Sequence, residues 1–398
     1  MSTSRMSTAT AVLLKRLHFY AGILVAPFLL VAAISGGLYA LAPQAEQLIY
    51  RAQLHTDSTG PNHSIAEQIE AAAATRPDLT VTAVRPAPEP GDTTRVLFED
   101  PTLGESTSLA VFVDPVTLRV AGELPSYGSS GSLPVRTWLD SLHRDLHLGE
   151  PGRLYSELAA SWLWVIALAG LALWVINRRK TKPLRSTPRT RTLNWHAVTG
   201  VWIIVALLFL SATGLTWSRY AGENITDLRA ALSWTQPTLS TALDASAAPA
   251  ASSGGHGHGD HGAPAATGSA AAATANAGYA DTALALARSA GVGGSDAVQI
   301  SIPSDDTTAF TVTEVRAPWQ FSPNSAAVDP RADQVIGVNW FADWPVAAQL
   351  ANLGIALHMG ILFGLLNQVV LFAVAVALTV MIVAGYRMWW LRRPRGAH

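Results

Sequence analysis

The chain has 398 residues, of which 49% are hydrophobic and only 14% charged, and its formal net charge is −1 at pH 7. Soluble domains average about a quarter charged residues, so this composition indicates a membrane protein. The chain contains no cysteine, which excludes disulfides, iron–sulfur clusters and thioether-linked haem of the C-x-x-C-H type.

Four segments are long and apolar enough to cross a bilayer, which requires about 20 residues. They are Leu17–Ala42, Leu158–Ile176, Trp195–Trp217 and Leu362–Trp389. The first is too long for the apolar core of a signal peptide, and Pro43 stands where cleavage would occur, so we expect a retained helix. Basic residues gather in the N-terminus, the loop 178–193 and the C-terminal tail. Their excess predicts that the loop and both termini are cytoplasmic.

The two long connections between spans are expected to form outer domains. Each shows one stretch of helical periodicity followed by short β-branched or alternating stretches, which is typical of a small α+β unit. The helical stretches are Ile65–Ala74 and Ala280–Ser289, and the β-rich stretches are Val81–Val84, Arg95–Phe98, Leu109–Val113, Val298–Ile302, Phe310–Val315 and Ala326–Val328. The expected fold class is an α-helical membrane bundle of four transmembrane helices, with a two-fold internal repeat and two small extracytoplasmic α+β domains.

These observations divide the chain into twelve stretches. In chain order they are the N-terminus with the first transmembrane helix (1–42), the first outer domain (43–134), an interfacial helix (135–157), the second transmembrane helix (158–177), a basic cytoplasmic loop (178–193), the third transmembrane helix (194–217), an outer segment (218–244), a low-complexity linker (245–277), the second outer domain (278–344), a second interfacial helix (345–361), the fourth transmembrane helix (362–390) and a basic cytoplasmic tail (391–398). Pro151-Gly152 is expected to break the first interfacial helix before its span. The linker is rich in Ala, Gly, Ser and Thr without periodicity, which predicts flexibility rather than a core element.

Residues of the two halves match at fixed offsets, which indicates a duplication. His18 and Gly22 correspond to His196 and Gly200, at an offset of 178 positions (196 − 18). His143 corresponds to His358 at an offset of 215 positions (358 − 143), and Val113-Asp114-Pro115 recurs at the same offset as Val328-Asp329-Pro330.

The matched histidines predict two haem sites. His18 and His196 lie at the cytoplasmic ends of the first and third spans, and a two-fold axis would let their imidazoles face each other. His143 and His358 would form a second pair toward the outer face. Facing imidazoles in a helix bundle are the usual way to hold a haem iron from both sides. The alternative is that these histidines are polar anchors at the membrane interface, because duplication copies anchors as well.

Other candidate residues surround these pairs. Gly22 and Gly200 lie one turn deeper than the inner histidines and would make room for a flat macrocycle, although tight helix contact explains them equally. His147 is one turn from His143 but is matched by Leu362. It is an alternative ligand, or a group that orients a ligand or a propionate.

The low-complexity linker contains three closely spaced histidines, His256, His258 and His261. They could bind Cu²⁺ or Zn²⁺ weakly, or simply belong to a solvated linker. The sequence has neither a G-x-G-x-x-G motif after a strand nor a Walker A loop. Electrons for the haems would therefore come from a quinol or from a separate cytoplasmic reductase.

The motifs that contain the histidines resemble those of the PepSY-associated transmembrane family. They are Arg16-Leu17-His18 with Gly22, Leu142-His143-Arg144-Asp145-Leu146 with Gly149, Trp195-His196, and Leu357-His358-Met359-Gly360 with Gly364. The resemblance covers nearly the whole chain except 245–277, and the outer domains look like PepSY domains. It implies a bacterial cytoplasmic (inner) membrane protein with two haem b groups, for which His18, His196, His143 and His358 are the axial ligands. Some members resemble iron-regulated di-haem reductases that reduce ferric siderophores on the outer side.

Three functions remain as hypotheses. The first is a transmembrane di-haem electron-transfer protein, which would make the chain a reductase of a ferric siderophore or another metal chelate. The second is a non-enzymatic PepSY membrane protein with a binding or regulatory role. The third is a copper or iron transport accessory that uses the histidine-rich linker. The expected partners are the lipid bilayer, the electron donor and the metal chelate, and no nucleic acid.

Overall fold

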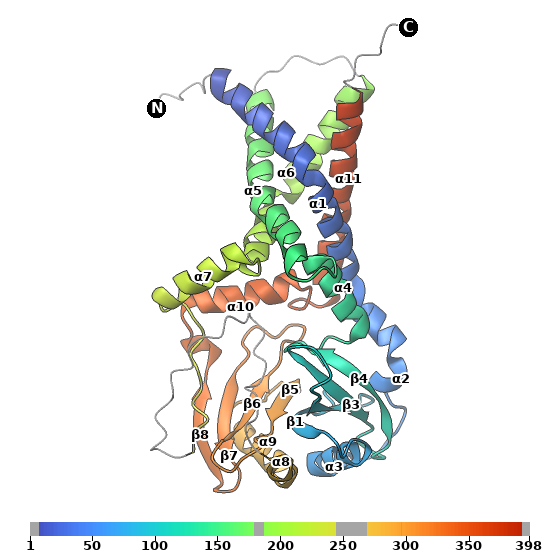
Figure 1. Cartoon of the computed structure of the whole chain (residues 1–398), viewed down its shortest axis with the longest axis vertical. Helices are drawn as coiled ribbons and strands as arrows, with labels where there is room; N and C mark the ends of the chain where they lie inside the picture. Colours follow the sequence, from blue (N-terminus) through green and yellow to red (C-terminus); the bar gives the residue numbers. More distant parts are fainter. Residues whose placement is uncertain (1–7, 179–186, 244–268, 296, 392–398) are drawn as a thin grey trace.

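A computed structural model describes the protein in residues 8–178, 187–243, 269–295 and 297–391. A bundle of long helices forms one end of an elongated molecule, and a β-sheet with short helices forms the other (Figure 1). The start of the first helix and the end of the last helix both lie at the end of the bundle that is remote from the sheet (Figure 1).

Four long helices make up the bundle. They are α1 (Thr8–Ile49), α5 (Glu150–Arg178), α6 (Pro188–Thr216) and α11 (Leu365–Trp390). Each contains a stretch that is long and apolar enough to cross a membrane, which confirms the four predicted spans. Helix α1 packs against α5 and α11, and α6 packs against the same two helices. Around the bundle, α1 and α6 therefore alternate with α5 and α11.

The connection between α1 and α5 differs from the predicted interfacial helix at 135–157. Helix α4 covers only Pro134–Asp145, and α5 already begins at Glu150. The break lies at Leu146 and His147, which both have left-handed backbone angles, and at Gly149. Pro151 stands in the first turn of α5 instead of breaking a helix, because its missing N–H is not needed there.

The other end of the molecule is built on a single antiparallel sheet of eight strands in the order β4-β3-β2-β1-β5-β6-β7-β8. The strands are β1 (Thr80–Arg85), β2 (Thr94–Glu99), β3 (Thr107–Val113), β4 (Val120–Tyr127), β5 (Val298–Ser301), β6 (Phe310–Glu314), β7 (Ser325–Asp329) and β8 (Gln334–Asn339). Six of them coincide with the predicted β-rich stretches, whereas β4 and β8 were not anticipated. Both missed strands are partly exposed and lie at the edges of the sheet, where hydrophobic patterning is weak.

The two predicted outer domains are joined rather than separate. Strand β1 of the first pairs with β5 of the second, with Ala83 opposite Ser301 and Val84 opposite Ile300. One hydrophobic core runs under both halves of the sheet. In addition, the Asp281 carboxylate of the second half accepts hydrogen bonds from the backbone N–H groups of Ile65 and Ala66, at 2.9 and 3.0 Å. A carboxylate at the start of a helix satisfies donors that have no partner within the helix.

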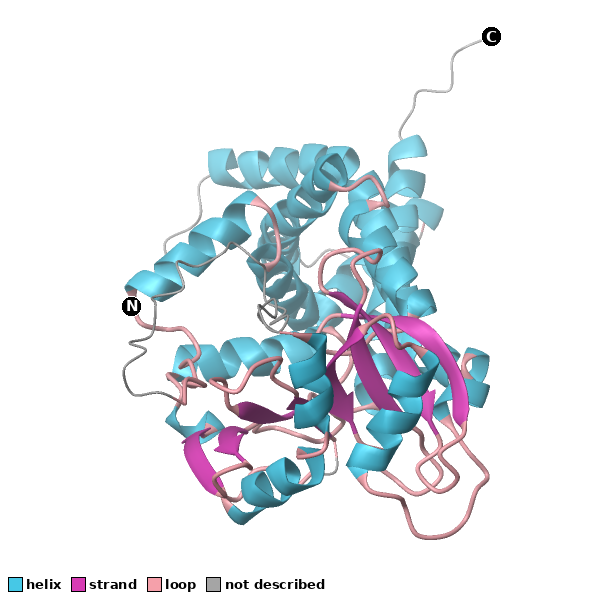
Figure 2. Cartoon of the chain, turned by 60° about the horizontal axis from the view of Figure 1, so that its bottom comes forward, coloured by secondary structure: helices cyan, strands magenta, loops and turns pink. Residues whose placement is uncertain are grey.

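Three short helices cover one face of the sheet: α3 (Ile65–Thr75), α8 (Ala270–Ala277) and α9 (Ala280–Ser289) (Figure 2). Helix α8 corrects the prediction that the linker extends to residue 277, because Ala273 and Ala277 are buried in it. Alanine has the highest helix propensity and is small enough to pack closely against strands. The alanine-rich stretch therefore forms a buried helix, although it contains no other apolar residues that would have indicated one.

Helices also lie between the bundle and the sheet. Helices α7 (Tyr220–Ala231) and α10 (Val346–His358) run across the bundle axis, and α4 runs obliquely beside them (Figure 1). Helix α10 corresponds to the second predicted interfacial helix, while α7 was not anticipated in the outer segment 218–244. The short helices α2 (Arg51–Leu54) and η1 (Phe341–Asp343) complete the described elements.

The first Val-Asp-Pro motif forms a turn that is fixed by its carboxylate. Oδ2 of Asp114 accepts hydrogen bonds from Ser58 Oγ at 2.5 Å and Thr56 Oγ1 at 2.7 Å, and Oδ1 accepts from the backbone N–H of Val116 at 2.9 Å. Burial alone would raise the pKa of Asp114, but these hydrogen bonds outweigh it and hold the pKa well below its usual range. The ionised carboxylate thus ties the segment after α2 to the turn between β3 and β4.

Replacing this carboxylate should destabilise the part of the molecule that contains the sheet. We expect Asp114→Asn to lower the free energy of unfolding by about 1–3 kcal/mol, since two donors lose a charged acceptor. Because the folded-state pKa is lowered, the contribution is present at neutral pH and is lost as the pH falls below about 4. Thermal unfolding at pH 7 would measure it, with the exposed neighbour Asp57→Asn as control. Equal stability of the two variants would contradict this role.

Candidate functional site

The structure brings His18 and His196 together inside the bundle. His18 comes from α1 and His196 from α6, the two helices that are separated around the bundle by α5 and α11. The centroids of their imidazole rings are 6.2 Å apart, and the ring planes are inclined at 78°. Both side chains are half-buried. We call these two residues the inner pair.

Each ring of the inner pair is fixed by a hydrogen bond to the backbone of an adjacent helix. Nδ1 of His18 lies 2.9 Å from the carbonyl oxygen of Ile166 in α5, and Nδ1 of His196 lies 3.1 Å from that of Met381 in α11. A carbonyl oxygen only accepts, so Nδ1 carries the proton in each ring and Nε2 carries the lone pair. This is the tautomer in which histidine binds a metal through Nε2.

Glycines lie near the inner pair, and one of them makes room for the His18 ring. A Cβ atom on Gly170 of α5 would lie 2.9 Å from Cε1 of His18, so the His18 ring occupies the place of a side chain there. A Cβ on Gly22 would meet no atom within 4 Å, whereas one on Gly200 would lie 3.1 Å from the Met381 side chain. Of the two glycines predicted to border a macrocycle, Gly22 faces open space and Gly200 faces a flexible side chain.

His143 and His358 form the outer pair, at the ends of α4 and α10 near the sheet. Nδ1 of His143 lies 3.1 Å from Ser35 Oγ of α1, and Nδ1 of His358 lies 2.6 Å from Thr213 Oγ1 of α6. Ser35 and Thr213 stand at the same offset of 17 positions from the inner-pair histidine of their helix (35 − 18 and 213 − 196). At about 1.5 Å per residue, the two pairs lie about 25 Å apart along the bundle.

The two outer rings lie close enough to influence each other. Burial, and then the charge of a protonated His143, lower the pKa of His358 to about 3. Burial likewise lowers the pKa of His143. Both imidazoles are therefore neutral at pH 7, with a lone pair available. The His143 ring packs against Gly36, whose Cβ would lie 3.0 Å from Cε1 of the ring.

His147 occupies a different position from His143. It is exposed, has a left-handed backbone, and donates its N–H to Oδ1 of Asp145 at 2.9 Å. Its ring lies on Trp138, with the centroids 4.9 Å apart. This contact is made at the surface of the molecule, so the geometry favours His143 over His147 as the partner of His358.

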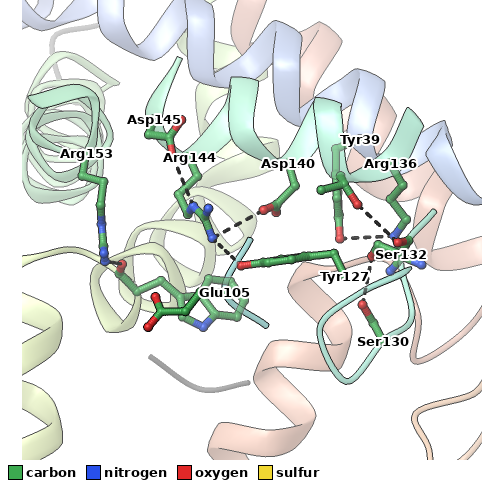
Figure 3. Close-up of polar contacts among 12 residues, drawn as sticks. Tyr39, Glu105, Tyr127, Ser130, Ser132, Arg136, Asp140, Arg144, Asp145 and Arg153 are labelled. Carbon is green, nitrogen blue, oxygen red and sulfur yellow. Dashed lines mark hydrogen bonds and ion pairs between the residues drawn. The ribbon is translucent and has the colours of Figure 1, made fainter. Parts of the chain in front are cut away.

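Arginines near the outer pair already have protein partners (Figure 3). Arg144 of α4 donates to the Tyr127 hydroxyl of β4 at 2.9 Å and pairs with Asp140 and Asp145 of its own helix at 3.7 and 3.5 Å. Arg153 of α5 donates to the carbonyl oxygen of Trp217 at 3.0 Å. The contact of Arg153 joins α5 to the end of α6. The contact of Arg144 with Tyr127 joins the sheet to α4 and so holds α4, from which His143 projects, against the sheet.

No group of three or more His, Cys, Asp or Glu side chains in the described ranges is arranged to hold a metal ion. His256, His258 and His261 lie outside the described residues, so the prediction of a copper or zinc site there stays a prediction.

Sequence reasoning missed the residues that orient the histidines. They are the hydroxyls of Ser35 and Thr213 and the backbone carbonyls of Ile166 and Met381. The same two offsets that relate the histidines contain the signal: Ser35 and Thr213 differ by 178 positions (213 − 35), and Ile166 and Met381 by 215 (381 − 166). The residue types at these matched positions are not identical, and a backbone acceptor leaves no trace in the sequence. Identity matching alone therefore could not find them.

The sequence matches the family model described as PepSY-associated TM region over residues 15–392. The matched range includes both histidine pairs and the whole sheet. No curated protein matches the sequence.

Substitution of Gly170, which contacts the His18 ring, should destabilise the protein more than substitution of Gly22, which has open space beside it. We expect Gly170→Ala to lower the melting temperature, because a Cβ 2.9 Å from the His18 ring must displace it. Gly22→Ala should leave stability unchanged or raise it by up to about 1 kcal/mol, since alanine favours the helix and finds room. Thermal unfolding of the two purified variants in detergent measures this difference. A lower melting temperature for Gly22→Ala than for Gly170→Ala would contradict the described packing of His18 against Gly170.

Proposed function

Because the chain belongs to the PepSY-associated TM region family, we propose that it is a transmembrane electron-transfer protein that holds two haem b groups. The inner pair, His18 and His196, would ligate one haem, and the outer pair, His143 and His358, the other. Each bound haem would supply a one-electron Fe³⁺/Fe²⁺ couple at its level of the bundle.

The separation of the inner rings is the observation that supports this proposal most directly. Two metal–imidazole bonds of about 2 Å each, with half an imidazole ring at either end, span about 6 Å between ring centroids. The inner pair has a centroid separation of 6.2 Å. Histidines that merely anchor helices at a membrane interface have no reason to meet across a bundle at this distance, each with Nδ1 engaged and Nε2 free of a described hydrogen bond.

The protein's own groups would do three things for such a centre. The carbonyls of Ile166 and Met381, and the hydroxyls of Ser35 and Thr213, hold the four rings in one tautomer and orientation. The open space at Gly22 gives room for a flat ring. The apolar side chains of the bundle exclude water, which fixes the surroundings of the iron and hence its redox potential.

The positions of the two pairs suggest a direction for the electrons. The basic loop 178–193 and the two chain ends would face the cytoplasm, and the sheet would face outward, in a bacterial cytoplasmic membrane. An electron from a quinol or a cytoplasmic reductase would enter at the inner pair and leave from the outer pair. The acceptor would be a ferric siderophore or another metal chelate, whose Fe³⁺ takes up one electron to become Fe²⁺. Reduction weakens binding by hard oxygen ligands and so favours release of the metal.

We also propose that the molecule consists of two related halves, each with two spans and a PepSY-like outer unit. The side-chain contacts support this: α1 and α6 each carry an inner histidine and, at the same distance further along the helix, the hydroxyl that meets an outer histidine. The sheet order, in which β4 to β1 are followed by β5 to β8, is what a pair of such units joined edge to edge would give.

Loss of single histidines tests the haem proposal. The purified protein should show b-type Soret and α bands that sharpen on reduction with dithionite. His18→Ala and His143→Ala should each remove about half of the haem, because each leaves one iron with a single axial ligand. His147→Ala is the matched control, since it removes a nearby histidine that the structure places on Trp138. A colourless wild-type protein would instead support a binding or regulatory role.

A bulky residue at Gly22 provides a second, sterically defined test. In the described structure a side chain at this position meets no protein atom within 4 Å of its Cβ. Gly22→Leu should therefore keep the melting temperature of the haem-free protein but lower the haem content by up to half. Haem content equal to that of the wild type, measured by the pyridine haemochrome spectrum, would show that the space beside Gly22 is not used.

A further inference from the structure

Three aromatic side chains gather where the sheet meets the last membrane span. Trp319 and Phe321 lie in the loop between β6 and β7, and Phe363 lies just before α11. The centroid of the Phe363 ring lies 5.3 Å from that of Trp319 and 5.7 Å from that of Phe321. We call these three residues the aromatic cluster. Trp319 is 60% exposed and Phe321 is 44% exposed, so the cluster presents a large apolar surface to its surroundings.

The loop that carries two of these residues is fixed to the segment before α11. The backbone N–H of Trp319 donates to the carbonyl oxygen of Leu362 at 2.8 Å. A Cβ on Gly364 would lie 3.2 Å from Cβ of Pro318, so the two segments are in contact there as well. The aromatic cluster is therefore held beside the first turn of α11 and does not stand at the tip of a free loop.

The backbone of Trp319 has a conformation that tryptophan rarely adopts. Its φ is +65°, in the left-handed region where the Cβ atom comes too close to the following carbonyl oxygen. Glycine enters this region freely, whereas for a bulky residue it is an outlier. Such strain persists mostly where the side chain contributes to function, which indicates a role for the exposed indole ring.

The corresponding loop between β2 and β3 does without these aromatic residues. At the offset of 215 positions, Gly104 corresponds to Trp319 (319 − 104) and Ser106 to Phe321 (321 − 106). The same offset relates the ends of β2 and β6, so the alignment of the two loops needs no gap. Gly104, Glu105 and Ser106 are all exposed. A polar loop therefore connects two strands of the same sheet equally well, and the fold itself does not require the aromatic cluster.

The exposed apolar surface of α11 begins directly after the aromatic cluster. Leu365, Leu366 and Val369 are all more than half exposed, and they belong to a helix that is long and apolar enough to cross a membrane. From Leu365 to Trp389 this helix rises about 36 Å over 24 residues (389 − 365). A bilayer measures about 30 Å across its hydrocarbon core and about 40–45 Å with its interfaces. Phe363 and Trp389 are thus spaced to lie in the two interfacial regions, where aromatic rings are enriched.

We propose that the aromatic cluster inserts into the leaflet nearest the sheet, at the boundary between headgroups and acyl chains, and so docks the sheet on the membrane. The bilayer is the partner because the cluster continues the lipid-facing surface of α11. An indole ring suits this boundary, since its apolar body lies among acyl chains while its N–H reaches polar headgroups. The contact requires no haem. Leu362 follows His358 by four residues, so docking also holds the connection between the outer pair and α11 at a fixed height.

Because the chain contains no cysteine, a single nitroxide spin label can be attached at one chosen position. Phe321→Cys places the label in the aromatic cluster, and Ser106→Cys places it at the corresponding position of the other loop. Both full-length proteins are reconstituted in phosphatidylcholine nanodiscs, with one copy in each disc. Oxygen concentrates among acyl chains and a neutral nickel chelate stays in water, so power-saturation EPR with each reagent reports the surroundings of the label. The label at 321 should be about three-fold less accessible to the nickel chelate than the label at 106, and more accessible to oxygen.

Two results of this comparison would overturn the inference. Equal accessibility of both labels to the nickel chelate would place the aromatic cluster in water. Low accessibility of the label at 321 to both reagents would show that protein, and not lipid, covers the cluster.

A second variant separates membrane docking from a role in folding. Trp319→Gly introduces the residue type found at position 104 and relieves the left-handed backbone. It should keep or raise the melting temperature in detergent. Combined with Phe321→Cys, it should raise the accessibility of the label to the nickel chelate to the value of the Ser106→Cys protein. A lower melting temperature would show that the indole ring supports the fold, and an unchanged label would show that Trp319 does not dock; either result would refute the proposed role.

Discussion

The hydrogen bond at Nδ1 of each matched histidine is the interaction on which the site depends. An imidazole on a long helix can rotate about two side-chain bonds, and either nitrogen can carry the proton. Ile166, Met381, Ser35 and Thr213 remove this freedom, each from a helix other than the one that carries the histidine. The packing of the bundle therefore sets ring orientation directly. A shift between two helices breaks the hydrogen bond, and a buried polar atom left unpaired costs about 1–3 kcal/mol.

The sequence was a good guide to the spans and a poor guide to what joins them. Long apolar runs identify α1, α5, α6 and α11 because the bilayer demands about 20 apolar residues wherever a helix crosses it. Repeat offsets singled out the four histidines because histidine is rare in the chain. The rest depended on tertiary contacts: the ends of α4 and α5 follow from left-handed residues at 146 and 147, and α8 packs by means of alanines that give no hydrophobic pattern.

The pairing of β1 with β5 was the largest departure from expectation. Each half of the sheet has four strands and would, alone, have an exposed edge on each side. Joining β1 to β5 removes two of these edges and lets one core extend under α3 and α9. Exposed strand edges invite unwanted pairing with other chains, so the union also protects both units. Nothing in the residues of β1 or β5 indicates whether the strand lies at an exposed edge of a sheet or pairs with another strand.

Helix α1 has a mechanical consequence that follows from its length. It runs unbroken for 42 residues, past His18, Ser35 and Gly36, to Glu46 beside the start of α4. The same helix therefore carries His18 of the inner pair and the residues Ser35 and Gly36, which contact the His143 ring of the outer pair. Pro27 lies inside this helix between His18 and Ser35, and an internal proline removes a backbone hydrogen bond and favours a kink. A movement of α1 at the sheet therefore reaches His18 only through the proline-containing turn, which makes the stiffness of that turn the quantity that couples the two levels of the bundle.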